Sequence, residues 1–279
     1  MANPARPALI INADDLGYSP GVNTAIADLY QAGLVTSTSL IVNLPHSEAG
    51  AAIARRLPGL SVGVHLNLSK GEPLLPAAQV PSLVDEAGRF WETAALYRHA
   101  LTGQINWYEA AAEMEAQIEW ALGRGLHVDN LDSHVHFHVL PAARRLITDL
   151  GQRYHVHAWR SPKVLSTLTP RMTWTDLLNR RDSDGPMVAP HYLLSLHQWG
   201  ERLLEDQRLR SLLAKPGTVT ELVAHPGYAP DPDLPLPDQL PPERRQAEVD
   251  MLSSSAFRGW LDDAGLALIS FASLHYVAA

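Results

Sequence analysis

The sequence predicts an α/β fold, an irregular (β/α) barrel of the TIM type, complete or incomplete, with its site at the carboxyl ends of the strands. Short apolar runs alternate with amphipathic segments that end at Gly or Pro, a pattern typical of parallel strands joined by helical crossovers. The number of such units in 279 residues fits a barrel better than an open doubly wound sheet, although an open sheet gives similar alternation. No linker divides the chain, so residues 1–279 are expected to form one domain.

Each expected strand is an apolar or β-branched run that stops where turn residues begin. The expected strands are Ala8–Ile11, Thr36–Val42, Ser61–Leu68, His127–Leu131, Val156–Arg160, Thr218–Ala224 and Leu266–Phe271. The expected helices have helical apolar spacing and most close at Gly or Pro. They are Gly21–Ala32 before Gly33, His46–Leu57 before Pro58, Trp107–Leu122 before Gly123, Pro141–Arg153, and Arg244–Ala264 before Gly265.

Three segments depart from this alternation. Ser69–Arg89 and Tyr228–Pro242 are rich in proline and acidic residues, and Ser161–Lys215 shows no clear pattern. The first two follow strands, so we expect them on the carboxyl face of the sheet, where loops build binding sites.

Composition excludes several classes of function. A net charge of −8 gives no basic footprint for nucleic acid or an anionic membrane. The absence of cysteine excludes disulfides, thiolate zinc sites and cysteine nucleophiles, so any metal would be held by nitrogen and oxygen. No apolar run is long enough to span a bilayer and no leader pattern precedes the first strand, so a cytoplasmic location is expected.

Ionisable side chains follow most of the expected strands at the same end. They are Asp14 and Asp15 after the first strand, His65 in the third, Asp132, His134, His136 and His138 after the fourth, Arg160 in the fifth, and His225 after the penultimate strand. Burying such charges costs several kcal/mol per ion unless they are paired or bind a metal. Singly, each residue has a structural alternative, such as a turn aspartate, a core histidine or a surface salt bridge of Arg160. Together they predict a metal site at the mouth of the barrel.

Alternating histidines would share one face of a strand, as in a metal site. One aspartate with two histidines leaves open positions for water and substrate, which favours a hydrolytic centre. The same ligand set also serves iron oxygenases. Zinc, magnesium, manganese and iron all remain possible, and histidine ligands favour a borderline metal over magnesium.

The remaining charged residues have matching roles in hydrolysis. Of the two adjacent aspartates, one would bind the cation and the other would be the general base. His225 is of the right type to protonate a leaving group. Asp132 could accept the second ring N–H of a ligand histidine, and Arg160 could hold the base carboxylate or a substrate oxygen.

Five sequence blocks resemble the YdjC-like carbohydrate deacetylases, which include the chitooligosaccharide deacetylases. The blocks are NADDLG, VTSTSLIVN, VGVHLNL, LDSHVHFH and VAHPGY, and the resemblance runs from about Leu9 to Leu274. It implies an irregular (β/α) barrel, a divalent metal (Mg or Zn), removal of acetyl groups from N-acetylglucosamine units of short oligosaccharides, and a homodimer.

The resemblance also implies roles for individual residues. Asp15, His65 and His134 would be the metal ligands, Asp14 the general base and His225 the general acid. His136 would lie near the metal or the substrate. The family block often reads DSHHHVH, whereas Val135 here replaces the middle histidine, which changes no implied ligand but alters any substrate contact at that position.

Two alternatives remain. A metal-dependent phosphoester hydrolase could use the same residues, but only Arg160 and Lys163 are candidate phosphate-binding cations near strand ends. A carbohydrate-binding protein without catalysis is the second. The P-loop and G-x-G-x-x-G motifs are absent, which excludes the chemistries they serve.

Overall fold

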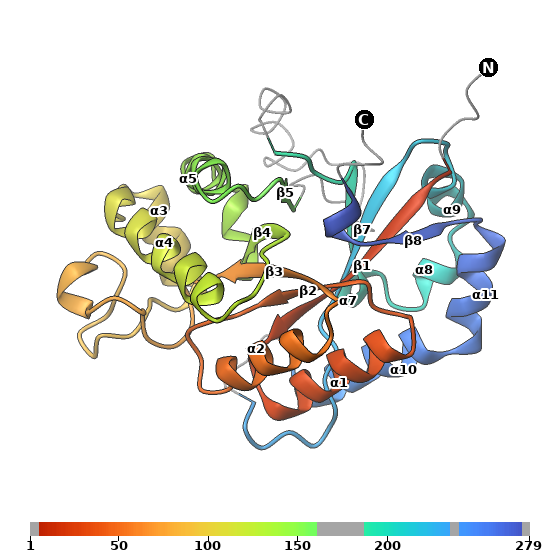
Figure 1. The fold of residues 1–279 in the computed structure, drawn as a ribbon, viewed down its shortest axis with the longest axis horizontal. Coiled ribbons are helices and arrows are strands. Elements are labelled where there is room, and N and C mark those ends of the chain that lie inside the picture. The colour runs from red at the N-terminus through yellow and green to blue at the C-terminus, as the bar shows by residue number, and fades with distance from the viewer. Residues whose placement is uncertain (1–5, 161–186, 235–239, 275–279) are drawn as a thin grey trace.

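The structure, a computed structural model, describes residues 6–160, 187–234 and 240–274. A single parallel sheet lies at its centre, in the order β5-β4-β3-β2-β1-β7-β6, with β8 paired to the first half of β1 (Figure 1). The strands are β1 (Ala8–Leu16), β2 (Ser37–Leu40), β3 (Ser61–Leu66), β4 (Asn130–Ser133), β5 (Ala158–Trp159), β6 (Tyr192–Ser195), β7 (Val219–Ala224) and β8 (Ala267–Ile269).

The sheet curls like part of a barrel, and its closure is not observed. Within the described residues, the outer strands β5 and β6 do not pair with each other. Ala158 instead forms a parallel bridge with Val188. The predicted α/β class with a parallel sheet is therefore confirmed, whereas a complete TIM barrel is not.

Helices cover the outside of the sheet. In Figure 1, α1, α2 and α10 lie along one side, and α3, α4 and α5 lie beyond β3 and β4. The α-helices are α1 (Pro20–Gln31), α2 (Ser47–Arg56), α3 (Thr93–Leu101), α4 (Trp107–Gly123), α5 (Pro141–Arg153), α7 (Leu196–Trp199), α8 (Arg202–Glu205), α9 (Gln207–Leu213), α10 (Pro242–Ser253) and α11 (Ser255–Asp263). Three short 3-10 helices are η1 (Ala77–Gln79), η2 (His134–Val139) and η3 (Phe271–Ser273).

Helix α1 shows how local sequence sets these elements. Ser19 caps its amino end by accepting the Val22 N–H, and Pro20 begins the first turn, where its missing N–H costs nothing. Val22, Ile26 and Leu29 recur at helical spacing and are buried against the sheet.

The prediction of one helix over Arg244–Ala264 is wrong. Ser254 adopts an extended conformation, with φ −70° and ψ 148°, and its side chain accepts the Phe257 N–H. It therefore ends α10 and caps α11, because a serine hydroxyl can replace the missing helical partner of a backbone N–H.

Other differences concern bounds and short elements. The fourth strand lies at Asn130–Ser133 rather than His127–Leu131, and the eighth is shorter than the run Leu266–Phe271. Strand β6 and helices α7, α8 and α9 occupy part of the stretch for which the sequence gave no pattern, because each is only a few residues long. Residues 161–186 of that stretch lie outside the described residues.

Strand β1 does not end at Ile11 as predicted but continues to Leu16 with a bulge. Its register with β2 shifts between Ala13 and Leu16, and Asp15 has φ 74°. In a regular strand, Asp14 and Asp15 would point to opposite faces. The bulge breaks this alternation, and both side chains line one cavity.

The amino ends of the strands are closed by polar contacts. The Ser37 hydroxyl accepts the Phe271 N–H at 3.1 Å. The Ser61 hydroxyl accepts the Ala272 N–H at 3.1 Å and donates to Asp129 Oδ2 at 2.7 Å. Helix η3 is thereby fixed against the start of β2 and β3.

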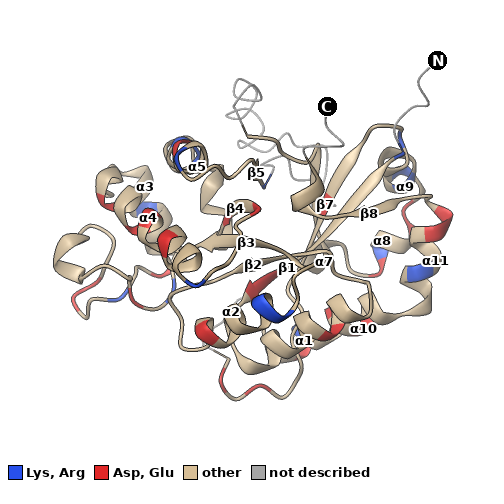
Figure 2. Ribbon diagram, in the orientation of Figure 1, with Lys and Arg blue, Asp and Glu red and all other residues tan. Residues whose placement is uncertain are grey.

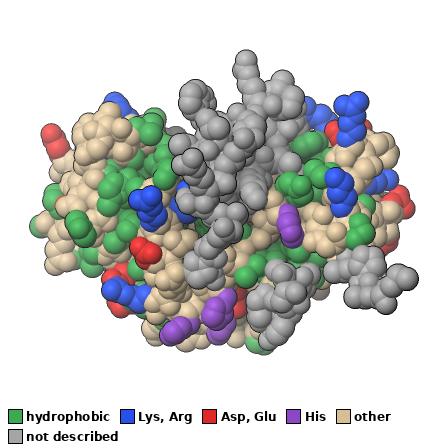
Figure 3. Space-filling view, turned by 90° about the horizontal axis from the view of Figure 1, so that it is seen from above, with side chains coloured by type: hydrophobic (Ala, Val, Ile, Leu, Met, Phe, Trp, Pro, Cys, Tyr) green, Lys and Arg blue, Asp and Glu red, His purple; other side chains and the backbone are tan. Residues whose placement is uncertain are grey.

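The face of the molecule seen in Figure 3 has no large patch of a single charge among its described residues. The face seen in Figure 3 bears basic and acidic side chains in small separate groups with hydrophobic side chains between them. None of the helices in the described residues has the length and hydropathy needed to cross a bilayer.

Candidate active site

A cavity of about 460 Å³ opens at the carboxyl ends of the central strands. Figure 2 shows that β1, β4 and β7 each carry acidic residues along the strand. The lining includes six of the residues singled out from the sequence: Asp14, Asp15, His65, His134, His136 and His225. Asp132 and Arg160 are buried behind them and bond to them.

His65, on β3, is oriented by Asp132. Its Nδ1 lies 2.9 Å from Asp132 Oδ1, while its Nε2 lies 3.7 Å from both Asp14 Oδ2 and Asp15 Oδ1. Burial lowers the pKa of His65, but the Asp132 and Asp14 carboxylates outweigh burial and raise it to about 9. With its Nδ1–H donated to Asp132, Nε2 is the atom that faces the cavity, and a cation bound there would displace the proton that the raised pKa keeps on the ring.

Asp15 presents one carboxylate oxygen without a hydrogen-bond partner. Its Oδ2 accepts from Arg245 Nη2 at 2.8 Å, whereas Oδ1 is buried and unpaired. Burial raises the pKa of Asp15, but Arg245 and His225 together outweigh it and lower the pKa to about 2. Asp15 is therefore ionised, with a free oxygen directed at His65.

The spacing between these atoms suits a shared cation. At 3.7 Å, His65 Nε2 and Asp15 Oδ1 are too far apart for a hydrogen bond. Two ligand atoms of one tetrahedral zinc ion lie about 3.4 Å apart, since zinc–ligand bonds are about 2.1 Å. The donor set and its unpaired oxygen therefore fit a divalent metal.

His134 lies beside His65, and their ring centroids are 5.6 Å apart. Its Nδ1 contacts the Ser69 hydroxyl at 2.8 Å, which holds the ring in place. Burial lowers the pKa of His134 to about 4. A neutral imidazole is the form that binds metals.

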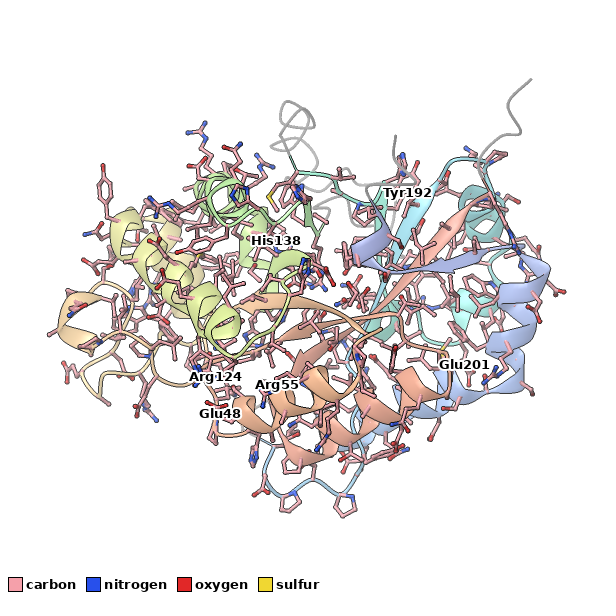
Figure 4. The ribbon with its side chains drawn as sticks, in the orientation of Figure 1. Glu48, Arg55, Arg124, His138, Tyr192 and Glu201 are labelled. Carbon is pink, nitrogen blue, oxygen red and sulfur yellow. The ribbon has the colours of Figure 1, made fainter. Side chains whose placement is uncertain are left out.

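The alternating histidines do not lie on a strand, so the prediction that strand pleating puts them on one face is wrong. Strand β4 ends at Ser133, and η2 follows with Val135 at φ 52° and His136 at φ 54°. His138 (Figure 4) is buried, with its Nδ1 bonded to the Ser133 hydroxyl at 2.8 Å. His134 and His136 reach the cavity, and His138 does not line it.

Asp14 is held by Arg160 in a two-point contact. Arg160 Nη1 and Nη2 lie 2.8 and 2.6 Å from its two oxygens, and Asn12 Nδ2 donates to Oδ1 at 2.7 Å. Burial raises the pKa of Asp14, but Arg160 and His65 outweigh burial and hold it well below the usual range. Its Oδ2 also lies 3.8 Å from His225 Nε2.

Arg160 is fully buried, so the alternative of a surface salt bridge is wrong. Besides Asp14, it contacts Asp132 Oδ2 at 2.6 Å and Glu221 Oε1 at 2.9 Å. One cation cannot neutralise three carboxylates. Burial raises the pKa of Glu221 to about 8, so Glu221 carries the proton of the group at neutral pH.

Sequence reasoning missed Glu221 and Arg245. Glu221 interrupts the apolar strand run TELVA, a signal that a buried partner was needed. Arg245 gave no signal, because a basic residue in an amphipathic helix is ordinarily solvated.

His225 follows β7 and is tied to α10. Its backbone N–H donates to Glu248 Oε2 at 2.6 Å, and its Nδ1 has no hydrogen-bond partner. Burial lowers the pKa of His225 and raises that of Glu248 to about 7.

Among the described residues, one group has its ligand atoms close enough together to hold a metal ion. Asp14, His65 and Asp132 each offer a ligand atom within 4.8 Å of the others. The set predicted from the sequence, Asp15, His65 and His134, shares His65 with that group. The carboxylates of Asp14 and Asp132 are engaged by Arg160, whereas Asp15 keeps one free oxygen.

Comparison with known proteins adds independent information. A sequence profile described as YdjC-like protein matches residues 8–263. The carbohydrate deacetylase of Brevibacillus brevis is 30% identical over 267 residues, covering 95% of this chain and 99% of that protein. The carbohydrate deacetylase of Geobacillus stearothermophilus is 32% identical over 266 residues, covering 94% of this chain and 96% of that protein.

The crystal structure of a similar protein is known. It comes from Enterococcus faecalis V583, and its name proposes cellobiose-phosphate cleavage. It superposes with a TM-score of 0.82 at 29% identity, covering 97% of this chain and 99% of that one. The similarity in sequence and fold thus extends over nearly the whole length of both chains.

Proposed function

The chain belongs to the YdjC-like protein family, and we propose that, as a carbohydrate deacetylase, it removes the acetyl group from N-acetylglucosamine units of short oligosaccharides with the help of one divalent metal. The observation that carries this proposal is the unpaired Asp15 Oδ1, buried 3.7 Å from His65 Nε2. A buried, ionised oxygen without a donor is costly unless a cation binds there.

Asp15, His65 and His134 are the proposed ligands. When bound, the metal supplies Lewis-acid activation of water and of the acetamide carbonyl. Asp132 supports this assignment because it takes the Nδ1–H of His65 and leaves Nε2 as the donor. Ser69 orients His134 in the same way. Zinc or magnesium is the expected ion.

Asp14 is the proposed general base. Arg160 and Asn12 fix its carboxylate beside His65, so that it accepts a proton from the attacking water without moving. His225 is the proposed general acid. Its Nε2 is 3.8 Å from Asp14 Oδ2, which places the two proton-carrying groups beside one another and allows His225 to protonate the departing amine.

The cavity also suits a sugar. Its volume of about 460 Å³ lies within the usual range of small-molecule sites. Polar side chains from separate segments, including Glu92 and Gln198, line it. Polar side chains in such a wall can hydrogen-bond the hydroxyl groups of a sugar.

A phosphoester hydrolase is less well supported. Arg160 is committed to Asp14, Asp132 and Glu221 and has no exposed surface, so it cannot hold a phosphate. Lys163 lies outside the described residues. A binding protein without catalysis would not need a base and an acid beside the ligand set.

The test is to remove metal with a chelator, restore zinc, magnesium or manganese singly, and measure acetate released from diacetylchitobiose. We expect release to disappear with the chelator and to return with one or more ions. Metal content, measured in parallel, should fall to background in Asp15→Asn. Equal acetate release with and without metal contradicts the proposal, as does full metal content in the variant.

A further inference from the structure

A second concave surface lies next to the proposed active site. It has a volume of about 820 Å³ and runs between α7–α8 and one face of α10. On α10, the lining residues Glu243, Ala247 and Met251 recur at helical spacing and so form one stripe. We call this surface the α8–α10 groove.

The groove adjoins the active-site cavity. His197, on α7, lines both. Glu248, also in the groove lining, accepts the backbone N–H of His225, the proposed general acid. An oligosaccharide with one sugar unit in the cavity could therefore place a neighbouring sugar unit in the groove.

The groove is acidic above an apolar floor. Leu196, Leu204 and Met251 supply the floor. The exposed acidic side chains at its edge are Glu201 (Figure 4), Glu205, Glu243 and Asp250. Within the described residues, none of these carboxylates forms an ion pair with a basic side chain, and Arg244 is the single basic residue in the lining. The edge therefore attracts a cation.

A buried polar atom provides independent evidence for a ligand. Glu248 is 6% exposed, and its Oε1 has no hydrogen-bond partner although its Oε2 is bonded to His225. A buried, unpaired carboxyl oxygen costs free energy that a bound partner would recover. A sugar hydroxyl in the groove would be such a partner whether or not Glu248 carries its proton, because a hydroxyl group both donates and accepts.

We propose that the α8–α10 groove binds a glucosamine unit bearing a free amine, so that the enzyme accepts partly deacetylated oligosaccharides with the next N-acetylated unit in the cavity. This inference rests on the proposed function. Deacetylation converts a neutral acetamide into an amine that is charged at neutral pH. A deacetylated sugar unit thus carries one positive charge more than an acetylated unit. An acidic groove can distinguish the two by this charge.

Calorimetric titration of the metal-loaded enzyme tests the groove without turnover. The probes are a glucosamine tetramer and cellotetraose, which is neutral and has no acetyl group to lose. We expect the glucosamine tetramer to bind about tenfold more tightly at low salt and this preference to shrink at high salt. The double variant Glu201→Gln/Glu205→Gln should weaken glucosamine binding fivefold to tenfold and leave cellotetraose unchanged.

The matched control is Glu72→Gln/Glu86→Gln, which removes two exposed charges from the Ser69–Arg89 loop and should change neither affinity. Equal affinity for the two sugars overturns the inference, as does equal weakening by both double variants. Spermidine, a polyamine without a sugar ring, serves as a control for simple attraction of cations. If spermidine binds as tightly as the glucosamine tetramer, the inference is also overturned. Absence of acetate release would contradict the proposed function while leaving this binding assay interpretable.

Discussion

The two ends of the same sheet are built differently. At the amino end, Ser37, Ser61 and Asp129 bond to the backbone of neighbouring segments. At the carboxyl end, buried charges crowd together, yet Asp15 Oδ1, Glu221 Oε2 and His225 Nδ1 have no hydrogen-bond partner. Asn130, at the amino end of β4, also has unpaired side-chain atoms, but it does not line the cavity. The difference teaches that unpaired atoms at the carboxyl end, on Asp15 and His225, belong to residues of a cavity that a metal and a substrate can enter.

The largest expected effect is that of Asp15→Asn at the carboxyl end. Asparagine tolerates the left-handed backbone conformation of this position, so the bulge should persist. Loss of the ligand charge should lower kcat/KM by about a thousandfold or more, and circular dichroism should remain that of the wild type. An activity loss below tenfold would remove Asp15 from the ligand set.

Replacing His225 by Ala should lower kcat by about 10²- to 10⁴-fold, the range for a lost general acid or base. Metal content should stay unchanged, because His225 is not a proposed ligand. A substrate with an activated leaving group, which needs no proton, should recover much of the loss. Steady-state kinetics on both substrates provide the measurement, and equal losses on both would argue against the acid role.

Glu248→Gln tests the stability cost of the carboxyl end. The native state keeps the Glu248 proton up to about pH 7, whereas the unfolded chain releases it near pH 4.5. Between these values the native state binds more protons, so the free energy of unfolding falls as pH rises. Glutamine cannot ionise, and the variant should be more stable than wild type by about 3 kcal/mol at pH 8 and equally stable near pH 4.

Urea unfolding at both pH values measures this difference. Glu86→Gln, at an exposed position, is the control and should follow the wild type. Parallel stability curves for wild type and Glu248→Gln would show that this carboxyl group is not destabilised by burial.

Ser61→Ala at the amino end should have the smallest effect. It removes the bonds to Asp129 and to the Ala272 N–H and should cost about 1 kcal/mol of stability. Activity per folded molecule should be unchanged, because the serine lies at the opposite end of β3 from His65. A large fall in kcat with normal stability would contradict the division between the two ends.

The alternation of strands and helices could be predicted from the sequence, but the closure of the sheet and the short elements could not. The α/β class and most long elements followed from apolar periodicity, as did the grouping of Asp14, His65 and His225 at one end of the sheet. Closure of the barrel could not be predicted, because alternation along the chain is the same in open and closed sheets. The short β6 carries too few residues to show a period.

Local backbone conformation accounts for the other errors. Leu-Asp-Ser-His-Val-His-Phe-His alternates like a strand, but Val135 and His136 adopt left-handed conformations that such side chains rarely occupy. The role of Arg245 depends on α10 packing near β1, a contact between residues 230 positions apart. No local pattern encodes such a pairing.

The bulge in β1 matters for the design of a similar aspartate pair in another protein. If the Asp-Asp dipeptide were placed on a regular strand, one carboxylate would point into the pocket and the other would point to the opposite face of the sheet. The unit to transfer is the left-handed backbone conformation of the second position together with both aspartates, and a β-branched residue at that position would disfavour this conformation.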